Sequence, residues 1–172
     1  MALPSDRTRA DDGSMETSAL TALLGDTWFG ADLPAGTRAR VAALGRLVDL
    51  PEGSVVVREG LPCRALGLVV SGRVALRLGL PGGQDRTILT VEAGDVFGWS
   101  AVLPPAISTS TGIAVAPSRA ILFDGEALRA ALVVDCELAA AVYERLLVSV
   151  ARRLTATRIQ LLDLYRPATE PW

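Results

Sequence analysis

Short apolar runs separated by glycine dominate the middle of the chain, between Asp49 and Asp124, and restrict its fold more than any other feature. The runs cover residues 55–58, 66–70, 74–78, 87–91, 113–115 and 120–123. The run with Val74, Leu76 and Leu78 alternates with other side chains, which is typical of a strand with one face in a core. Turn-forming glycines separate the runs at intervals of about 7 to 12 residues, which favours an antiparallel barrel or jelly roll. Connections this short exclude a parallel βαβ sheet.

Helical patterns flank the predicted strands on both sides. Residues 34–47 place Val41 and Leu44 at helical spacing after Pro34, a residue suited to a first helical turn. Beyond the last run, Asp124 and Asp135 stand where side-chain oxygens cap helices, which predicts a short helix and then a long one over residues 136–165. The predicted fold class is therefore mainly β with flanking α. It is an antiparallel β-roll or jelly roll (double-stranded β-helix) with an N-terminal helix and a long C-terminal helix.

The chain of 172 residues fits one domain. Residues 1–25 are rich in small and polar residues with little periodicity, so we expect a flexible N-terminal tail there. The domain is expected over residues 26–166, followed by a short tail over 167–172 that leaves no room for a helix-turn-helix. No run reaches the roughly 18 apolar residues of a membrane-spanning helix, and no secretory signal is present. We expect a soluble, cytoplasmic protein without membrane contact.

The basic residues exclude much enzymatic chemistry, because all 17 of them are arginine and the chain has neither lysine nor histidine. Without histidine there is no Ser-His-Asp couple and no histidine-ligated metal, and without lysine there is no Schiff base. Cys63 and Cys136 are too few for an iron–sulfur cluster and are expected to be reduced and structural. We therefore expect no enzyme, no catalytic residue, no metal and no cofactor. A cupin-type enzyme, which also uses a jelly roll, is the least supported class.

The formal net charge of −2 argues against a nucleic acid partner, since such partners normally require a concentrated basic surface. The pair Arg152 and Arg153 is the most basic feature of the predicted long helix. We interpret this pair as a solvated helix face rather than as a DNA-binding patch.

The segment from Glu92 to Ala101, with the sequence EAGDVFGWSA, carries the most chemical information. A strand stops at Gly94, and a short helix-compatible stretch follows. Free backbone N–H groups in the first turn of a helix are a natural seat for a phosphate or carboxylate. A plain β-turn explains these residues as readily as an anion site does. Both interpretations stay open.

The order of these elements resembles the cyclic-nucleotide-binding fold of Crp/Fnr-type regulators. The resemblance covers about residues 28–165 and rests on Pro51-Glu52-Gly53, Arg58-Glu59-Gly60, Ser71-Gly72-Arg73 and Phe97-Gly98, between two helical regions. It implies a sensory or regulatory module that acts through dimer or partner contacts. The ligand-binding residues that it implies are Phe97, Gly98, Trp99, Ser100 and Ala101 of the phosphate-binding cassette, the run Ser108, Thr109, Ser110 and Thr111, and Thr157, which would meet the nucleobase.

Two positions depart from the pattern of family members that bind cyclic nucleotides. Those members have a glutamate after the Phe-Gly pair, which holds the ribose hydroxyl, whereas this chain has Trp99. They also have an arginine that pairs with the cyclic phosphate, whereas residues 108–111 contain no cation. Such a charge-assisted contact is worth about 1.5–3 kcal/mol, and hydroxyls replace it only in part. We expect weak or no binding of cyclic AMP.

Several alternatives remain for the pocket. Another arginine, such as Arg73, Arg77, Arg86 or Arg158, could reach the cradle, the pocket could take a cyclic nucleotide or another small ligand, anionic or less charged, or it could be vacant. A vacant pocket would suit a structural or scaffolding interaction protein. For Trp99 we favour a role as core or pocket filler over a stacking platform. For residues 108–111 a threonine-rich edge strand and an anion-contacting loop are equally favoured.

The predicted long helix carries a heptad-like apolar seam. Leu147, Val150, Leu154, Thr157, Leu161 and Leu164 recur at alternating spacings of three and four residues. Such a seam either packs on the roll of its own chain or pairs with a second copy. We favour a homodimer through Leu147, Val150, Leu154, Leu161 and Leu164, and a protein partner is the other interaction considered.

Overall fold

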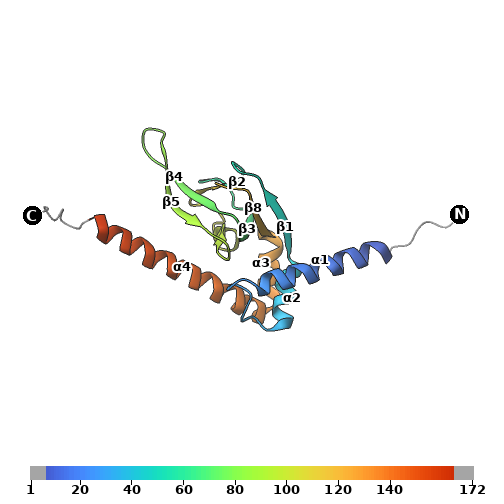
Figure 1. The fold of residues 1–172 in the computed structure, drawn as a ribbon. Helices are drawn as coiled ribbons and strands as arrows, with labels where there is room; N and C mark the ends of the chain where they lie inside the picture. Colours follow the sequence, from blue (N-terminus) through green and yellow to red (C-terminus); the bar gives the residue numbers. More distant parts are fainter. Residues whose placement is uncertain (1–6, 165–172) are drawn as a thin grey trace, which may run out of the picture.

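The strands form two four-stranded antiparallel sheets in the computed structural model, which describes residues 7–164 and the side chains of residues 15–159, 161 and 162. One sheet has the order β1 (Gly45–Leu50), β8 (Ser118–Asp124), β3 (Ala65–Ser71) and β6 (Val96–Phe97). The other has the order β2 (Val55–Val57), β7 (Thr111–Ala114), β4 (Val74–Gly79) and β5 (Asp85–Val91). Figure 1 shows the two sheets as a roll with the helices gathered along one side. The predicted fold class is confirmed.

The first sheet separates two apolar clusters, one between the sheets and one between the sheet and the helices. On β8, Ala120 belongs to the inter-sheet cluster, whereas Ile121 and Phe123 belong to the helix-side cluster. On β3, Leu68 faces the helices and Val69 the inter-sheet cluster. A strand buried on both faces reads as a continuous apolar run, which explains why residues 66–70 and 120–123 do not alternate.

Helix α1, Arg7–Gly25, occupies most of the segment for which the sequence predicted a flexible tail. Residues 7–25 are thus helical rather than irregular, whereas residues 1–6 lie outside the described part of the chain. Leu20 and Leu24, one helical turn apart, are 3% and 0% exposed and belong to the helix-side cluster. They anchor the C-terminal end of α1, and its N-terminal part projects away from the roll (Figure 1). The polar composition of the segment concealed this anchor.

Helix α2, Ala35–Ala43, ends short of the predicted boundary at residue 47, because the chain enters β1 at Gly45. A Cβ at Gly45 would lie 2.7 Å from Ile121 Cγ2 and 2.9 Å from Phe123 Cε1, so only glycine lets the backbone pair this closely with β8. Leu47 therefore belongs to β1 and not to the predicted helix. Strands β1 and β6 are the two that the apolar pattern did not predict.

Helices α3, Gly125–Val134, and α4, Cys136–Leu164, follow the two aspartates that the sequence predicted as caps. Asp124 Oδ1 accepts the N–H of Ala127 at 2.9 Å, and Asp135 Oδ1 accepts the N–H of Leu138 at 2.9 Å. Each carboxylate thus satisfies an otherwise free amide of a first helical turn. The predicted long helix is present over 136–164, and position 165 lies outside the described residues. Within residues 7–164, no helix combines the length and the apolar character that a membrane crossing requires.

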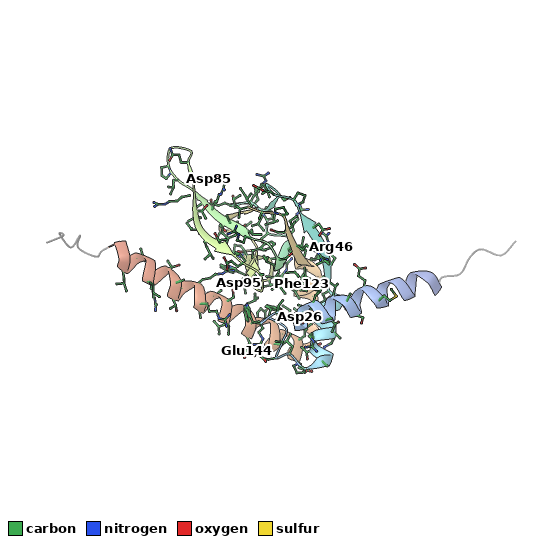
Figure 2. All side chains as sticks on the ribbon, viewed as in Figure 1. Asp26, Arg46, Asp85, Asp95, Phe123 and Glu144 are labelled. Carbon is green, nitrogen blue, oxygen red and sulfur yellow. The ribbon has the colours of Figure 1, made fainter. Side chains whose placement is uncertain are left out.

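Helix α4 has two apolar faces. One is buried against the domain through Leu138, Val142 and Leu146, followed by Ser149. The other, the predicted seam, is open: the exposed fractions are 69% for Leu147, 38% for Val150, 52% for Leu154 and 49% for Leu161. The side chain of Leu164 lies outside the described ones. The C-terminal part of α4 extends beyond the roll in Figure 1, and its side chains stand clear of the domain in Figure 2. The four described leucine and valine side chains of the seam are therefore left largely uncovered by the roll of their own chain.

Candidate ligand-binding cassette

The first half of the candidate site is the turn from β6 into a short 3-10 helix, η1 (Trp99–Val102). Gly98 joins the two elements in the left-handed conformation, with φ of 69°, and a Cβ there would lie 2.4 Å from the carbonyl oxygen of Ala65. Both conditions require glycine. The N–H of Ala101 donates to the carbonyl oxygen of Gly98 at 2.9 Å. One amide of the turn that the sequence suggested as an anion seat is therefore used within the turn itself.

The side chains of this turn point to different cores. Phe97 is 0% exposed and belongs to the inter-sheet cluster with Ala101, while Ser100 is also buried. Trp99 is half-buried and packs against the helix-side cluster. The indole thus lies between the sheet and the helices, and this packing favours the interpretation of Trp99 as a core filler over a stacking platform.

The hydroxyl run, residues 108–111, forms the second half of the candidate site. Ser108 and Ser110 are buried, and Ser108 Oγ donates to the carbonyl oxygen of Ser110 at 2.8 Å. Thr111 Oγ1 accepts the N–H of Glu59 at 3.1 Å, and Thr109 is exposed. Residues 108–110 form a loop and Thr111 begins β7, which lies between β2 and β4, so the run is not the edge strand considered from the sequence. Three of these four side chains are engaged in their own structure: Ser108 and Thr111 in hydrogen bonds, and Ser110 by burial.

The segment around Leu61 to Cys63 joins the two halves of the site, and sequence reasoning missed it. The N–H of Ser108 donates to the carbonyl oxygen of Leu61 at 2.9 Å, and the N–H of Cys63 donates to that of Ala106 at 2.7 Å. The Cys63 thiol lies 3.4 Å from the carbonyl oxygen of Gly98. The tripeptide Leu61-Pro62-Cys63 has no glycine or charge pattern that could have revealed this role.

The two cysteines occupy different environments, and both are free thiols. Cys63 is buried at the cassette, and this burial raises the pKa of its thiol. Cys136 is exposed at the first residue of α4.

The arginines considered as substitutes for the missing phosphate ligand do not line the inter-sheet core. Three of them are exposed, namely Arg73, Arg86 and Arg158. Arg77 is half-buried on β4 and pairs in register with Thr111 of β7. Ala114, three residues further along β7, belongs to the inter-sheet cluster, so strand alternation places Thr111 and Arg77 on the outer face. Thr157 is exposed on α4, and no hydrogen bond joins its described side chain to the cassette.

Two other arginines hold the cassette from the helices. Arg129 Nη1 on α3 donates to the carbonyl oxygen of Ala101, and Arg153 Nη2 on α4 donates to that of Val96. The half-buried position of Arg153 corrects the prediction of a solvated Arg152–Arg153 face. Position 153 extends the buried row of α4 beyond Ser149 at helical spacing, a signal that could have revealed its role.

Burial lowers the pKa of the Arg153 guanidinium from its ordinary value, and the nearby carboxylate of Asp95 acts in the opposite direction. Arg152 remains exposed, and its guanidinium carbon lies 4.5 Å from the centroid of the Trp28 ring. This geometry is that of a cation–π contact.

Residues 47–135, which include the strands from β2 to β8 and α3, match the family model of the cyclic nucleotide-binding domain. The chain belongs to the cyclic nucleotide-binding domain family. The CRP-like cAMP-activated global transcriptional regulator of Mycobacterium tuberculosis is 32% identical to this cyclic nucleotide-binding domain over 117 residues, which are 68% of this chain and 50% of that protein. The chain thus spans about half the length of this relative. The resemblance to Crp/Fnr-type regulators is confirmed.

Solved structures agree with this assignment. A putative cyclic nucleotide-binding protein from Geobacter metallireducens has a TM-score of 0.69 at 25% identity, covering 80% of this chain and 97% of that one. The catabolite activator protein of Thermus thermophilus has a TM-score of 0.63 at 24% identity, covering 83% of this chain and 62% of that one. At this level of identity the second similarity concerns the fold of the cyclic nucleotide-binding domain alone.

Proposed function

We propose that the chain is a non-enzymatic regulatory module of the cyclic-nucleotide-binding type with weak or no affinity for cyclic AMP. In this proposal it acts through contacts of α4 with a second copy or with a protein partner. Direct binding of nucleic acid is not part of it, because the chain has a net charge of −2.

The observation that carries the proposal is that hydroxyl side chains of residues 108–111 are bound within the protein itself. Relatives that bind cyclic nucleotides are expected to have a cation in this stretch. Ser108 Oγ is bound to the carbonyl oxygen of Ser110, and Thr111 Oγ1 accepts the amide of Glu59. A phosphate would have to displace these bonds and would still meet no charge from residues 108–111. Trp99, which replaces the expected glutamate, packs against the helix-side cluster instead of offering a ribose ligand.

Isothermal titration calorimetry of the full chain with cyclic AMP and cyclic GMP tests this part of the proposal. We expect no measurable heat at micromolar ligand, which corresponds to a dissociation constant in the millimolar range or above. Micromolar binding of either nucleotide would overturn the altered-cassette proposal and restore an ordinary cyclic-nucleotide sensor.

The exposed seam of α4 supports a homodimer as the acting form. Four described apolar side chains of the seam share one helix face at heptad spacing while a different face contacts the domain. Exposed apolar stripes of this kind are normally covered in a coiled-coil partner. Size-exclusion chromatography with light scattering should give twice the chain mass of 18.0 kDa at micromolar concentration. A monomer at that concentration would contradict the dimer.

A scaffolding protein with a vacant pocket is the second candidate function. It is favoured by Val133 and Val134 at the end of α3, two neighbouring apolar side chains that are 81% and 83% exposed. In this case a partner should remain bound in stoichiometric amount without nucleotide, and the paired substitution Val133→Ser with Val134→Ser should release it. A partner that is released by added cyclic nucleotide would instead favour the sensor.

A further inference from the structure

The cassette is held at both of its ends by guanidinium groups that come from the helices. The carbonyl oxygen of Val96, at the start of the turn, accepts a hydrogen bond from Arg153 of α4. The carbonyl oxygen of Ala101, at the other end, accepts one from Arg129 of α3. The residues between them, 97–100, include the positions at which relatives are expected to contact a ligand. Both contacts are backbone contacts, so they depend on the position of the turn rather than on its side chains.

The α3 end is closely packed. A Cβ at Gly125, the first residue of α3, would lie 3.1 Å from both Ala101 Cβ and the Ala101 carbonyl oxygen. The N–H of Gly125 donates to the carbonyl oxygen of Arg64 at 2.7 Å. Arg129 stands one helical turn after this glycine and reaches the same residue, Ala101. Movement of η1 away from α3 would therefore break a packing contact and a charge-assisted hydrogen bond together.

At the α4 end, side chains of α4 lie against the start of the cassette and against Trp28. The guanidinium of Arg153 is half-buried, its Nε has no partner in the described structure, and Ser149 is buried one turn earlier. Arg152 covers the Trp28 ring, and a Cβ at Gly94, just before β6, would lie 3.3 Å from Trp28 Cδ1. Figure 2 places Asp95 on the side of the roll that faces α4. The part of α4 that carries Arg152 and Arg153 thus lies against Trp28, between α1 and α2, and against the start of the cassette.

We infer that Arg129 and Arg153 form a brace that fixes the cassette to α3 and α4 through contacts of the protein itself. The inference deepens the proposed function, because it concerns the regulation of the same cassette. A ligand shifts a conformational equilibrium only by its difference in affinity between the two states. A ligand that moved the cassette would therefore have to break the contacts of Arg129 and Arg153. Loss of the brace frees the cassette from both helices, whereas α4 itself stays held by Leu138, Val142 and Leu146.

Hydrogen–deuterium exchange of the full chain, followed by mass spectrometry, tests the brace. Arg153→Met removes the α4 contact, Arg129→Met removes the α3 contact, and Arg158→Met on the exposed face of α4 is the matched control. A charge-assisted hydrogen bond of the expected strength corresponds to about 10- to 100-fold faster exchange at the amides of residues 94–103. The control should leave these amides unchanged, and exchange in β3 and β8 should stay slow in all three variants.

Unchanged exchange over residues 94–103 in both Arg153→Met and Arg129→Met would overturn the brace. Should Arg153→Met not fold, Arg153→Lys keeps one donor on a flexible stem, and it should fold with exchange between that of wild type and that of Arg129→Met. Exchange in Arg153→Lys equal to that of wild type would overturn the contribution of the guanidinium. Added millimolar cyclic AMP should leave wild-type exchange at the cassette unchanged. Slower exchange with the nucleotide would contradict the proposed function. The result for Arg153→Met and Arg129→Met tests the brace whether or not the nucleotide binds.

Discussion

The ring of Phe97 lies directly against the backbone of Gly67, and a Cβ added at Gly67 would come within 2.1 Å of the ring atom Cζ. The two residues pair in register between β6 and β3, so the glycine provides the space that lets the cassette enter the inter-sheet core. We predict that Gly67→Ala destabilises the protein by about 1–3 kcal/mol or more, since the ring or the strand must move. Urea unfolding measures this. Gly36→Ala in α2 is the control, because its Cβ would meet nothing closer than 3.9 Å, and it should be neutral or slightly stabilising. Equal stability of the two variants would contradict the packing described.

The ion pairs between Arg40 on α2 and the start of α4 should make the free energy of unfolding depend on pH. Its Nε lies 3.0 Å from Asp135 Oδ2 and its Nη2 lies 3.0 Å from Glu137 Oε2. Thr37 Oγ1, which donates to Glu137 Oε1 at 2.9 Å, and Arg40 together lower the pKa of the Glu137 carboxyl. A carboxyl whose folded pKa is lowered stabilises the fold above its unfolded pKa, near pH 4.3, and loses that contribution as pH falls through the folded value.

Glu137→Gln therefore should reduce the free energy of unfolding at pH 7, and its difference from wild type should shrink as the pH falls below the unfolded pKa of about 4.3. The effect should be small, because the carboxylate is exposed. Urea titrations at pH 7, 4 and 3 measure it, and Glu144→Gln, on the same helix, is the control. A difference that grows as the pH falls would contradict the assigned ion pair.

Restoring the two altered cassette positions should raise affinity for cyclic AMP. The double variant with Trp99→Glu and Ser108→Arg supplies the ribose ligand and the cation that the resemblance implies, and one charge-assisted contact is worth about 10- to 100-fold. Calorimetry should show the largest gain for the double variant. Thr109→Arg, at the exposed position of the same run, is the control for charge alone. An equal gain from Thr109→Arg would mean that added charge rather than the restored site binds the nucleotide.

A charged substitution on the exposed seam should remove the dimer and leave the fold of the monomer intact. Leu154→Glu places a charge at a described seam position and should give a monomer by light scattering, with unchanged circular dichroism. Leu162→Glu changes a leucine that is 70% exposed but lies off the seam, and it should remain a dimer. If both variants behaved alike, the seam would not be the dimer contact.

Much of the architecture could be predicted from local patterns. The apolar runs and glycines of residues 55–123 predicted the strands of the roll apart from β1 and β6, and Asp124 and Asp135 predicted the helix starts. Strand β6 contains only Val96 and Phe97, too few residues for a periodic signal. Helix α1 depends on two leucines whose partners lie far along the chain, and β1 depends on the fit of Gly45 against β8. Non-local contacts of this kind leave no mark in a local pattern.

The candidate site was harder to predict for the same reason. The turn at Phe97-Gly98 and the hydroxyl run are visible in the sequence, but the segment that joins them, Leu61 to Cys63, has no distinctive composition. Arg129 and Arg153 act on backbone carbonyls, so no complementary side chain reveals their targets. Arg153 follows Arg152 directly, and only the fold separates the half-buried guanidinium from the exposed one.

Because only one of the two thiols is exposed, the native chain has a single accessible cysteine for a spectroscopic label. Reaction with a maleimide requires a thiolate that solvent can reach. Cys63 is buried with a raised thiol pKa, whereas Cys136 stands exposed where α4 begins. A fluorophore or spin label offered to the unmodified chain should therefore attach at α4 and leave the cassette intact. Distance measurements between labels on two copies could then follow the orientation of α4 without any engineered cysteine.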